Sequence, residues 1–311
     1  MRFPDHDPTL AFSPLAIRAA ADVILAGGIV AVPTETVYGL AADATDAGAV
    51  ARIYTAKGRP SFNPLIVHVA DLAAAQKLAL FDTDALALAE AFWPGPLTLV
   101  LPVRAGSGIA SLVTAGLETV AIRVPRHRAM QALLAESGRP LAAPSANASG
   151  GISPTRAAHV RASLGSAVPI LDDGATEAGL ESTIVAGRTI LRPGPVTASM
   201  LSEVLGSVEQ GPDAPAIVTA PGQLASHYAP RKPLRLNATE AAADEWLIGF
   251  GAVAGQDTLS ASGDPVEAAA KLFDALHRAD AGDRPRLAIA PIPVEGIGEA
   301  INDRLRRAAT R

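Results

Sequence analysis

The segment at residues 57–64 (KGRPSFNP) places Lys57 and Arg59 on either side of a glycine, in a loop that also holds two prolines. Lysine supplies a point charge and arginine a planar fork of donors, a combination that suits a polyphosphate. A solvated basic loop is the alternative, and these residues alone leave both open. His68 follows on an apolar strand at 65–70. On its own it is better explained as a hydrogen-bonded, half-buried histidine than as a catalyst.

Two further segments carry polar side chains at the end of a predicted strand or along its face. Residues 33–40 (PTETVYGL) follow a buried strand, where open α/β sheets usually place ligands, and Thr36 can hydrogen-bond a small polar substrate there. A loop whose hydroxyls cap a turn is an equally good explanation. Along residues 119–125 (TVAIRVP), alternation puts Arg123 on one face of a strand. It is a candidate clamp for a carboxylate, or an edge arginine that reaches water.

A fourth polar cluster spans residues 142–155 (AAPSANASGGISPT), which leave one strand and enter a helix. Small residues let the backbone approach a ligand, and hydroxyls with free N–H groups can cradle phosphate. A plain Ser/Gly loop is the weaker explanation, because a strand-to-helix connection is the position at which phosphate is commonly bound. The segment therefore favours an anion site.

Several common catalytic motifs are absent from the sequence. There is no P-loop, no G-x-S-x-G elbow and no H-E-x-x-H. There is also no cysteine, which removes thiol nucleophiles, disulfides and zinc–thiolate sites, and the six histidines show no metal-ligand spacing. The glycines at 249 and 251 follow a predicted strand, but no clear helix opens after them, which disfavours a dinucleotide turn.

Helix and strand signals alternate along the chain, with some adjacent strands. Ser13 and Pro14 suit a helix start before Gly27, and Asp46 suits the cap of a second helix. These signals predict a mixed α/β sheet with packed helices over residues 13–205. Strands are expected at about 29–32, 65–70, 97–101, 119–124, 140–143, 168–171, 182–186 and 189–192.

The chain divides at a Pro- and Gly-rich stretch. Residues 206–233 lack helical periodicity and are predicted to link two domains. Residues 234–311 are then predicted to form a small α/β domain, with helices at about 264–279 and 296–309. The domains expected are 13–205, 206–233 as linker and 234–311.

The charge balance disfavours a nucleic-acid-binding module. The net charge is −5, and division near residue 205 gives 15 basic and 17 acidic residues (−2) before it and 11 and 14 (−3) after it. Strong direct binding to nucleic acid is therefore not expected. The N-terminus lacks an apolar leader, and the apolar stretch 91–103 carries three prolines. We expect no membrane association and a cytoplasmic protein.

The four clusters, in this order, resemble the threonylcarbamoyl-AMP synthase (YrdC-like) family. Its K-x-R … S-x-N signature is present as Lys57, Arg59, Ser145 and Asn147. The likeness covers about residues 13–205, and the linker segment PGQLASHYAP with the C-terminal unit resembles the long, two-domain form. The resemblance implies a YrdC-like mixed, twisted sheet with packed helices, followed by a small Rossmann-like α/β domain.

The family reaction would join L-threonine, bicarbonate (or CO2) and ATP into threonylcarbamoyl-adenylate and release pyrophosphate. Downstream tRNA threonylcarbamoyl transferase proteins would use the product to modify an adenosine beside the anticodon. Mg²⁺ is expected with ATP, held by phosphate and without a protein-only metal cage. An RNA-binding YrdC-like module and a carbamoyl-transfer relative are the alternatives.

The resemblance also implies roles for individual residues by motif position. The residues implied to bind ATP are Lys57, Arg59, Asn63, Thr119, Ser145, Ser153, Arg192 and Tyr228, of which Lys57 and Arg59 are implied to be catalytic. The residues implied to surround L-threonine are Thr36, His68, Arg123, the Ala143 backbone and Thr183. The choice between Thr183 and Ser182 stays open, and Asn147 belongs to the signature without an assigned role. Tyr228 resembles a linker residue that lies over ATP, so 206–233 is expected to act as a lid.

Overall fold

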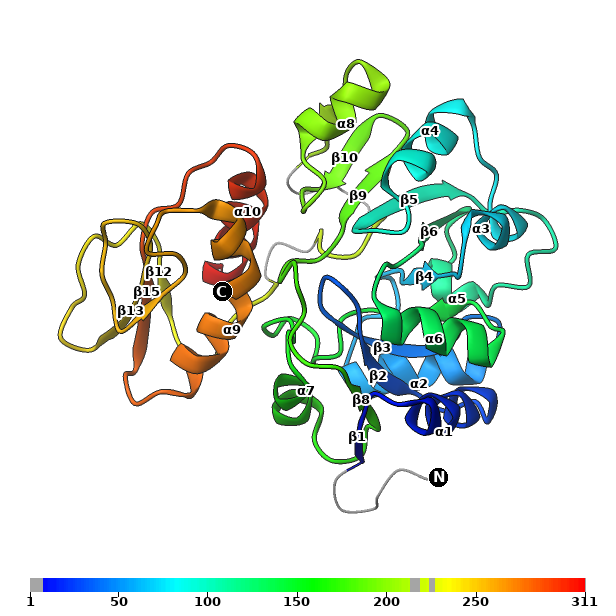
Figure 1. The fold of residues 1–311 in the computed structure, drawn as a ribbon, viewed down its shortest axis with the longest axis horizontal. Coiled ribbons are helices and arrows are strands. Elements are labelled where there is room, and N and C mark those ends of the chain that lie inside the picture. Colours follow the sequence, from blue (N-terminus) through cyan, green and yellow to red (C-terminus); the bar gives the residue numbers. More distant parts are fainter. Residues whose placement is uncertain (1–7, 213–218, 224–226, 311) are drawn as a thin grey trace.

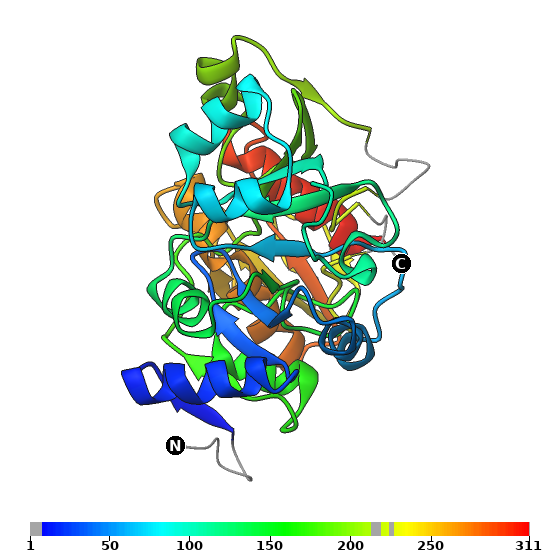
Figure 2. The ribbon, with the colours of Figure 1, turned by 90° about the vertical axis from the view of Figure 1, so that its right-hand side faces the viewer.

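The structure, a computed structural model, describes residues 8–212, 219–223 and 227–310. These residues form two lobes, each built on a β-sheet with helices packed against it (Figure 1). In both views α1 (Pro14–Leu25) lies at one end of the larger lobe and α8 (Ala198–Leu205) at the other (Figure 2). Two parts of the predicted linker, 213–218 and 224–226, lie outside the described residues.

The larger lobe carries a mixed sheet, as the sequence predicts. Besides α1 and α8, its elements are β1 (Thr9–Ala11), β2 (Val30–Pro33), β3 (Tyr38–Asp43), α2 (Ala47–Lys57), β4 (Ile66–His68), α3 (Leu72–Leu78), α4 (Thr83–Phe92), β5 (Leu97–Pro102), α5 (Ser111–Thr114), β6 (Thr119–Arg123), α6 (Arg128–Ser137), β7 (Leu141–Ala142), α7 (Ala157–Leu164), β8 (Ile170–Asp172), β9 (Thr183–Ala186), β10 (Thr189–Arg192) and β11 (Glu209–Gln210). Among the described residues the strand order is β1-β8-β2-β3-β7-β4-β6-β5-β9-β10-β11, with parallel and antiparallel neighbours.

The residues at the two ends of α2 explain why Lys57 and Arg59 lie close together. The Asp46 side chain accepts hydrogen bonds from the backbone N–H groups of the first turn and caps the helix. Gly58 ends the helix in the left-handed conformation, with φ at 58°. Lys57 therefore occupies the last helical position, and Arg59 starts the following loop. The sequence predicted the Asp46 cap, but it placed Lys57 in the following loop, whereas Lys57 is the last residue of the helix.

The segment at residues 33–40 differs from its prediction as a loop after a strand. Its second half is β3, which pairs antiparallel with β2 in a hairpin. The Thr34 hydroxyl donates to the Val37 carbonyl at 2.7 Å and closes the turn between the strands. A pattern search along one segment misses this strand, because β3 is defined by its pairing with β2. Thr36 thus lies at the tip of a hairpin.

The smaller lobe is a parallel sheet with two helices, which fits the predicted Rossmann-like unit. Its elements are β12 (Leu234–Arg235), β13 (Glu245–Gly249), β14 (Asp257–Thr258), α9 (Pro265–Ala281), β15 (Arg286–Ile289) and α10 (Ile297–Ala309), in the strand order β12-β15-β13-β14. Both helices lie between the small sheet and the larger lobe (Figure 1). The glycine-containing turn after β13 leads to β14, and α9 begins only after Asp264. No helix in the described part of the chain has the length and apolarity needed to cross a membrane.

The two lobes share a hydrophobic core. Val37, Ile152 and Leu180 of the larger lobe belong to the same buried cluster as Phe273 on α9. Gly179 makes this close packing possible, because a Cβ atom built there would lie 2.4 Å from a backbone carbonyl oxygen of α9. The smaller lobe is therefore packed onto the larger one through buried apolar side chains.

We expect Gly179→Val to reduce stability strongly. The variant combines a clash against the α9 backbone with a side chain at φ of +67°. Overpacking and strain together should lower the free energy of unfolding by about 2–4 kcal/mol, measured by chemical denaturation. Gly187→Val is the matched control, because Gly187 also has a positive φ but nothing within 4 Å of its Cβ position. Equal losses in both variants would contradict tight packing at Gly179.

Candidate active site

A small cavity lies where the β2–β3 hairpin tip, β4, β6 and β10 meet the described linker residues. Its volume is about 40 Å³. The sequence-predicted residues that line it are Thr36, Arg59, His68, Arg123, Ala143, Ser145, Arg192 and Tyr228. Segments far apart in the sequence therefore meet at one place, and they include residues from all four polar clusters.

Three other predicted residues stand directly behind this wall. Lys57 donates from Nζ to the backbone carbonyls of Ser145 and Asn147, each at 2.5 Å. Asn63 accepts a hydrogen bond at 2.7 Å from the guanidinium of Arg59. The two halves of the K-x-R … S-x-N signature are therefore in contact, because Lys57 at the end of α2 donates to the backbone of the loop after β7.

Three cations at this place are buried without a carboxylate partner. Lys57, Arg59 and Arg192 are 3%, 8% and 5% exposed. Among the described residues, none of the three has a carboxylate within ion-pair distance, and Arg59 and Arg192 donate to carbonyl and side-chain oxygens instead. Burying unpaired charge is costly, so such a cluster is typical of a site that takes up an anion.

The pKa values of the cations reflect this cost. Burial, with the nearby Arg59 charge, lowers the pKa of Lys57 well below its usual value. Burial likewise lowers the pKa of Arg59 to about 10. A bound polyanion would offset the desolvation and stabilise the charged forms. The site is therefore electrostatically suited to a polyphosphate.

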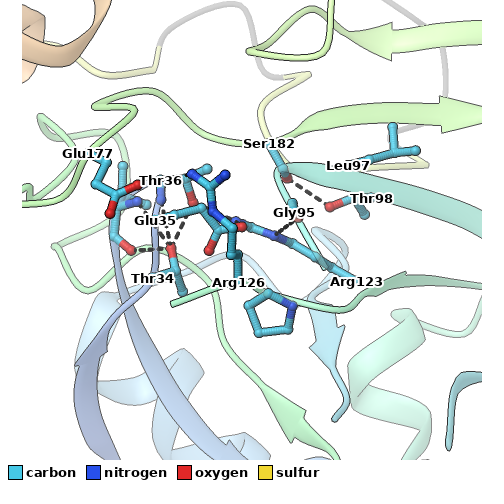
Figure 3. Close-up of polar contacts among 12 residues, drawn as sticks. Thr34, Glu35, Thr36, Gly95, Leu97, Thr98, Arg123, Arg126, Glu177 and Ser182 are labelled. Carbon is cyan, nitrogen blue, oxygen red and sulfur yellow. Dashed lines mark hydrogen bonds and ion pairs between the residues drawn. The ribbon is translucent and has the colours of Figure 1, made fainter. Parts of the chain in front are cut away.

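A buried ion pair joins Arg123, which lines the cavity, to Glu35 (Figure 3). Arg123 extends from the end of β6 past Gly95, whose carbonyl accepts from Nε at 3.1 Å. Its other nitrogens contact the Thr36 hydroxyl at 2.9 Å and a Glu35 carboxylate oxygen at 2.7 Å. Burial alone would raise the pKa of Glu35, but the Arg123 charge holds it below its usual value. Glu35 is therefore an anion, paired with a fixed cation.

His68 on β4 stands beside this pair, because it pairs in register with Arg123 on β6. Burial and the Arg123 charge lower the pKa of His68 to about 3, so its imidazole is neutral. Its Nδ1 is buried and has no hydrogen-bond partner among the described residues. The ring thus offers a neutral polar atom that a ligand could use.

Ser182 and Thr183, between which the sequence left the threonine contact open, have different surroundings in the structure. Ser182 lines the cavity, and its hydroxyl lies 2.7 Å from the Thr98 hydroxyl. The Thr183 hydroxyl instead donates to the Val196 carbonyl at 2.7 Å. Thr119 begins β6, at the end of that strand away from Arg123, and does not belong to the lining found in the described residues.

Two carboxylates of the site were not singled out from the sequence. Glu35 lies between the two threonines of the hairpin tip, and Glu181 directly precedes Ser182 on the cavity wall. The sequence signal was available for Glu35, because a buried arginine such as Arg123 needs a counterion nearby. Glu181 also accepts a hydrogen bond from the Ser153 hydroxyl, so Ser153 reaches the wall through it.

The described linker residues close the cavity on one side. Tyr228 is 1% exposed and has a φ of +63°, a strained conformation for a non-glycine residue. Tyr228 lines the cavity, and its buried hydroxyl has no hydrogen-bond partner among the described residues. Pro221 accepts a hydrogen bond from Arg192 at 3.3 Å, and the Ala229 N–H donates to the Gly150 carbonyl at 2.8 Å. The linker thus contacts both sides of the cationic cluster.

Comparisons with known proteins agree with this arrangement. A family model described as Telomere recombination matches residues 22–194, and one described as Threonylcarbamoyl-AMP synthase, C-terminal domain, matches residues 196–310. The threonylcarbamoyl-AMP synthase of Bacillus subtilis is 39% identical and covers 99% of this chain and 96% of its own length. That of Pyrococcus abyssi is also 39% identical, over 94% of each chain.

A solved structure extends the likeness to the whole fold. The crystal structure of P. abyssi Sua5 complexed with L-threonine superposes with a TM-score of 0.89 at 36% identity. The match covers 97% of this chain and 96% of the other. The chain belongs to the threonylcarbamoyl-AMP synthase family, whose members are enzymes of the nucleotidyl-transfer type.

Proposed function

We propose that this chain joins L-threonine, bicarbonate and ATP into threonylcarbamoyl-adenylate and releases pyrophosphate. The observation that carries the proposal is the pairing, in one cavity, of buried cations that lack carboxylate partners with a separate, charge-balanced arginine site. The first part suits a triphosphate and the second a zwitterionic amino acid. In the reaction, the threonine amine becomes a carbamate whose carboxylate attacks the α-phosphorus. No covalent enzyme intermediate is needed, which suits a chain without cysteine.

On the nucleotide side, the proposed phosphate ligands are Lys57, Arg59 and Arg192. Their fixed positive charge would neutralise the charge that develops on the leaving pyrophosphate. The cavity-lining Ser145 belongs to the loop after β7, and its backbone carbonyl accepts a hydrogen bond from Lys57. The other proposed nucleotide contacts are Asn63, Thr119, Ser153 and Tyr228. The Asn147 side chain donates to the Ala148 and Gly151 carbonyls at 2.9 Å each and so supports the shape of its own loop.

On the amino-acid side, Arg123 would pair with the threonine carboxylate. Glu35, which is not among the residues that line the cavity, balances the charge of the lining Arg123. The neutral His68 and the Thr36 hydroxyl would contact the rest of threonine, with the Ala143 backbone nearby. The last proposed contact with threonine comes from the segment that holds Ser182 and Thr183. Ser182 lines the cavity, which favours Ser182 over Thr183 for this contact.

Mg²⁺ is proposed to arrive with ATP. In the parts of the chain that the structure describes, no group of three or more His, Cys, Asp or Glu side chains is arranged to hold a metal. Glu181, the carboxylate on the cavity wall, is already engaged by Ser153 and by Arg304. These residues fit an ion held mainly by phosphate oxygens and water, whose charge would help to neutralise the triphosphate.

The activated product is proposed to pass to tRNA threonylcarbamoyl transferase proteins in the cytoplasm. Its mixed anhydride would hydrolyse in water, so the enzyme must keep the cavity closed during the reaction and release the product to a nearby acceptor. The acidic balance of both parts of the chain favours this division of labour over direct binding of tRNA.

The linker at 206–233 is proposed to act as a lid, with domains at 13–205 and 234–311. A cavity of about 40 Å³ has space for roughly three waters, so a nucleotide can enter only if covering residues move. The described residues that cover it include Pro221, Gly222 and Tyr228. The structure is therefore interpreted as a closed state.

We expect Tyr228→Ala to lower turnover about ten-fold, because the loss of the ring removes the packing that holds the lid shut. Tyr228→Phe is the matched control and should keep most of the turnover, since it retains the ring. The measurement is the rate of threonine-dependent pyrophosphate release. Full activity in Tyr228→Ala, or in a chain truncated after residue 205, would exclude the lid.

The proposed function is tested by incubating the protein with ATP, Mg²⁺, bicarbonate and each amino acid in turn, and measuring pyrophosphate. We expect release only with L-threonine and bicarbonate together. Release that needs neither would point to a carbamoyl-transfer relative or another nucleotidyl transfer. Specific RNA binding without release would favour the RNA-binding alternative.

A further inference from the structure

An arginine from the smaller lobe is buried beside the active site. Arg304 on α10 has no exposed surface, although it carries a full charge. Its Nε donates to a Glu181 carboxylate oxygen at 2.9 Å, across the boundary between the lobes. Burial would lower the pKa of Arg304, but the adjacent Tyr228, Glu181 and Asp303 raise it above its usual value. The guanidinium is therefore a permanent charge inserted from one lobe into the other.

Arg304 is the ion-pair partner of a carboxylate that lines the cavity, Glu181. Glu181 lines the cavity on the same side as Arg192, which donates to the backbone carbonyl of Ser182. A carboxylate at this place would repel a triphosphate unless a cation compensates it. Arg304 supplies a cation there, which it shares with Asp303, whose carboxylate accepts from Arg304 at 2.7 Å. The Ser153 hydroxyl donates to the other carboxylate oxygen of Glu181. The positive charge that faces Glu181 therefore comes from the smaller lobe.

Arg304 also contacts the linker. Its guanidinium carbon lies 5.3 Å from the centre of the Tyr228 ring, within the range of a cation–π interaction. The same helix meets the linker through its backbone, because the His227 N–H donates to the Arg307 carbonyl at 3.3 Å. The Tyr228 ring packs on its other neighbours, His227 and Phe273, with centroids 4.1 and 5.7 Å away. One buried arginine thus joins Glu181 to the covering tyrosine.

We infer that Arg304 is a positioning residue for ATP, through which the smaller lobe sets both the charge of the phosphate site and the closed position of Tyr228. This inference rests on the proposed function for the identity of the anion. It gives the C-terminal lobe a role in catalysis although the lobe contributes no described residue to the cavity lining. The competing explanation is that Arg304 only joins the lobes mechanically.

The test compares Arg304→Met with the control Arg306→Met, measuring the affinity for a non-hydrolysable ATP analogue by calorimetry. Arg306 lies on the same helix, its side chain is 58% exposed, and its contact with Asp303 is at the limit of an ion pair, 4.0 Å. We expect Arg304→Met to weaken binding about ten-fold or more, because the uncompensated Glu181 charge then faces the phosphates. Arg306→Met should bind like the original chain. Unchanged affinity in a folded Arg304→Met variant would overturn the inference.

A second variant separates charge from mechanical joining. Arg304→Met combined with Glu181→Gln removes both charges of the Arg304–Glu181 pair, while Asp303 keeps its contact with Arg307 at 3.0 Å. We expect this double variant to recover most of the lost affinity. The double variant still lacks the contact with Tyr228, so hydrogen exchange at the backbone amides of residues 227–229 should stay faster than in the original chain. If the double variant binds as weakly as Arg304→Met, or if exchange at 227–229 is unchanged in both, the positioning role is wrong.

These outcomes remain distinct from failure of the proposed function. The analogue-binding and exchange measurements need no turnover, so they test Arg304 even if no threonine-dependent pyrophosphate is released. Conversely, loss of pyrophosphate release in Arg304→Met with normal analogue affinity would leave the reaction assignment intact and overturn the inference.

Discussion

Arg59→Met is expected to reduce threonine-dependent pyrophosphate release by about 10²–10³-fold, the range observed when a fixed transition-state donor is removed. Arg59 is 8% exposed, lines the cavity and is held by three hydrogen bonds to Asn63 and Pro64. This rigid support means that no other side chain can replace its charge without rearrangement. The loss should appear in the rate of the chemical step and in the affinity for ATP.

The same substitution should leave the fold intact. Arg59 has no carboxylate partner among the described residues, so its removal leaves no unpaired anion behind, although Asn63 loses a donor. Arg52→Met on the exposed face of α2 is the control and should keep full activity. Melting curves accompany the rate measurement. Wild-type rates in Arg59→Met, or a loss matched by Arg52→Met, would contradict the phosphate assignment.

Arg123→Met is expected to have two separable effects. Its loss leaves Glu35 buried and unpaired, which should cost about 3–5 kcal/mol of stability. It also removes the proposed partner of the threonine carboxylate, so the KM for threonine should rise by about 10²-fold or more. The KM for ATP should change far less, because the three phosphate-side cations are untouched.

Arg123→Met combined with Glu35→Gln distinguishes the two effects. The double variant contains no unpaired buried charge, so we expect it to regain most of the stability lost in the single variant. It should not regain affinity for threonine. Denaturation curves and the KM values for both substrates are the measurements. Recovery of threonine affinity together with stability would show that Arg123 only stabilises the fold.

Some parts of this site could be predicted from the sequence because their signals are local. The Asp46 cap marks the start of α2, the helix that ends next to Arg59. The face of Arg123 follows from alternation along β6. These assignments depend on residues within one turn or one strand, which a single sequence displays directly.

Other parts depend on contacts between distant segments and were therefore missed or left open. β3 is defined by its pairing with β2, and the polar turn between the two strands led the sequence analysis to predict a loop there. The orientation of Ser182 against Thr183 depends on the Val196 backbone, which takes the Thr183 hydroxyl. Arg304 has arginine neighbours on the same helix, and only the packing of the two lobes distinguishes it from the exposed Arg306.

The most direct test of the central claim is the composition of the reaction product. The purified protein is incubated with ATP, Mg²⁺, L-threonine and isotopically labelled bicarbonate, and the adenylate is analysed by mass spectrometry. The account predicts an adenylate that contains both threonine and the labelled carbon, formed in equal amounts with pyrophosphate. A threonyl-adenylate without the labelled carbon, or pyrophosphate release without any threonine-containing adenylate, would contradict it.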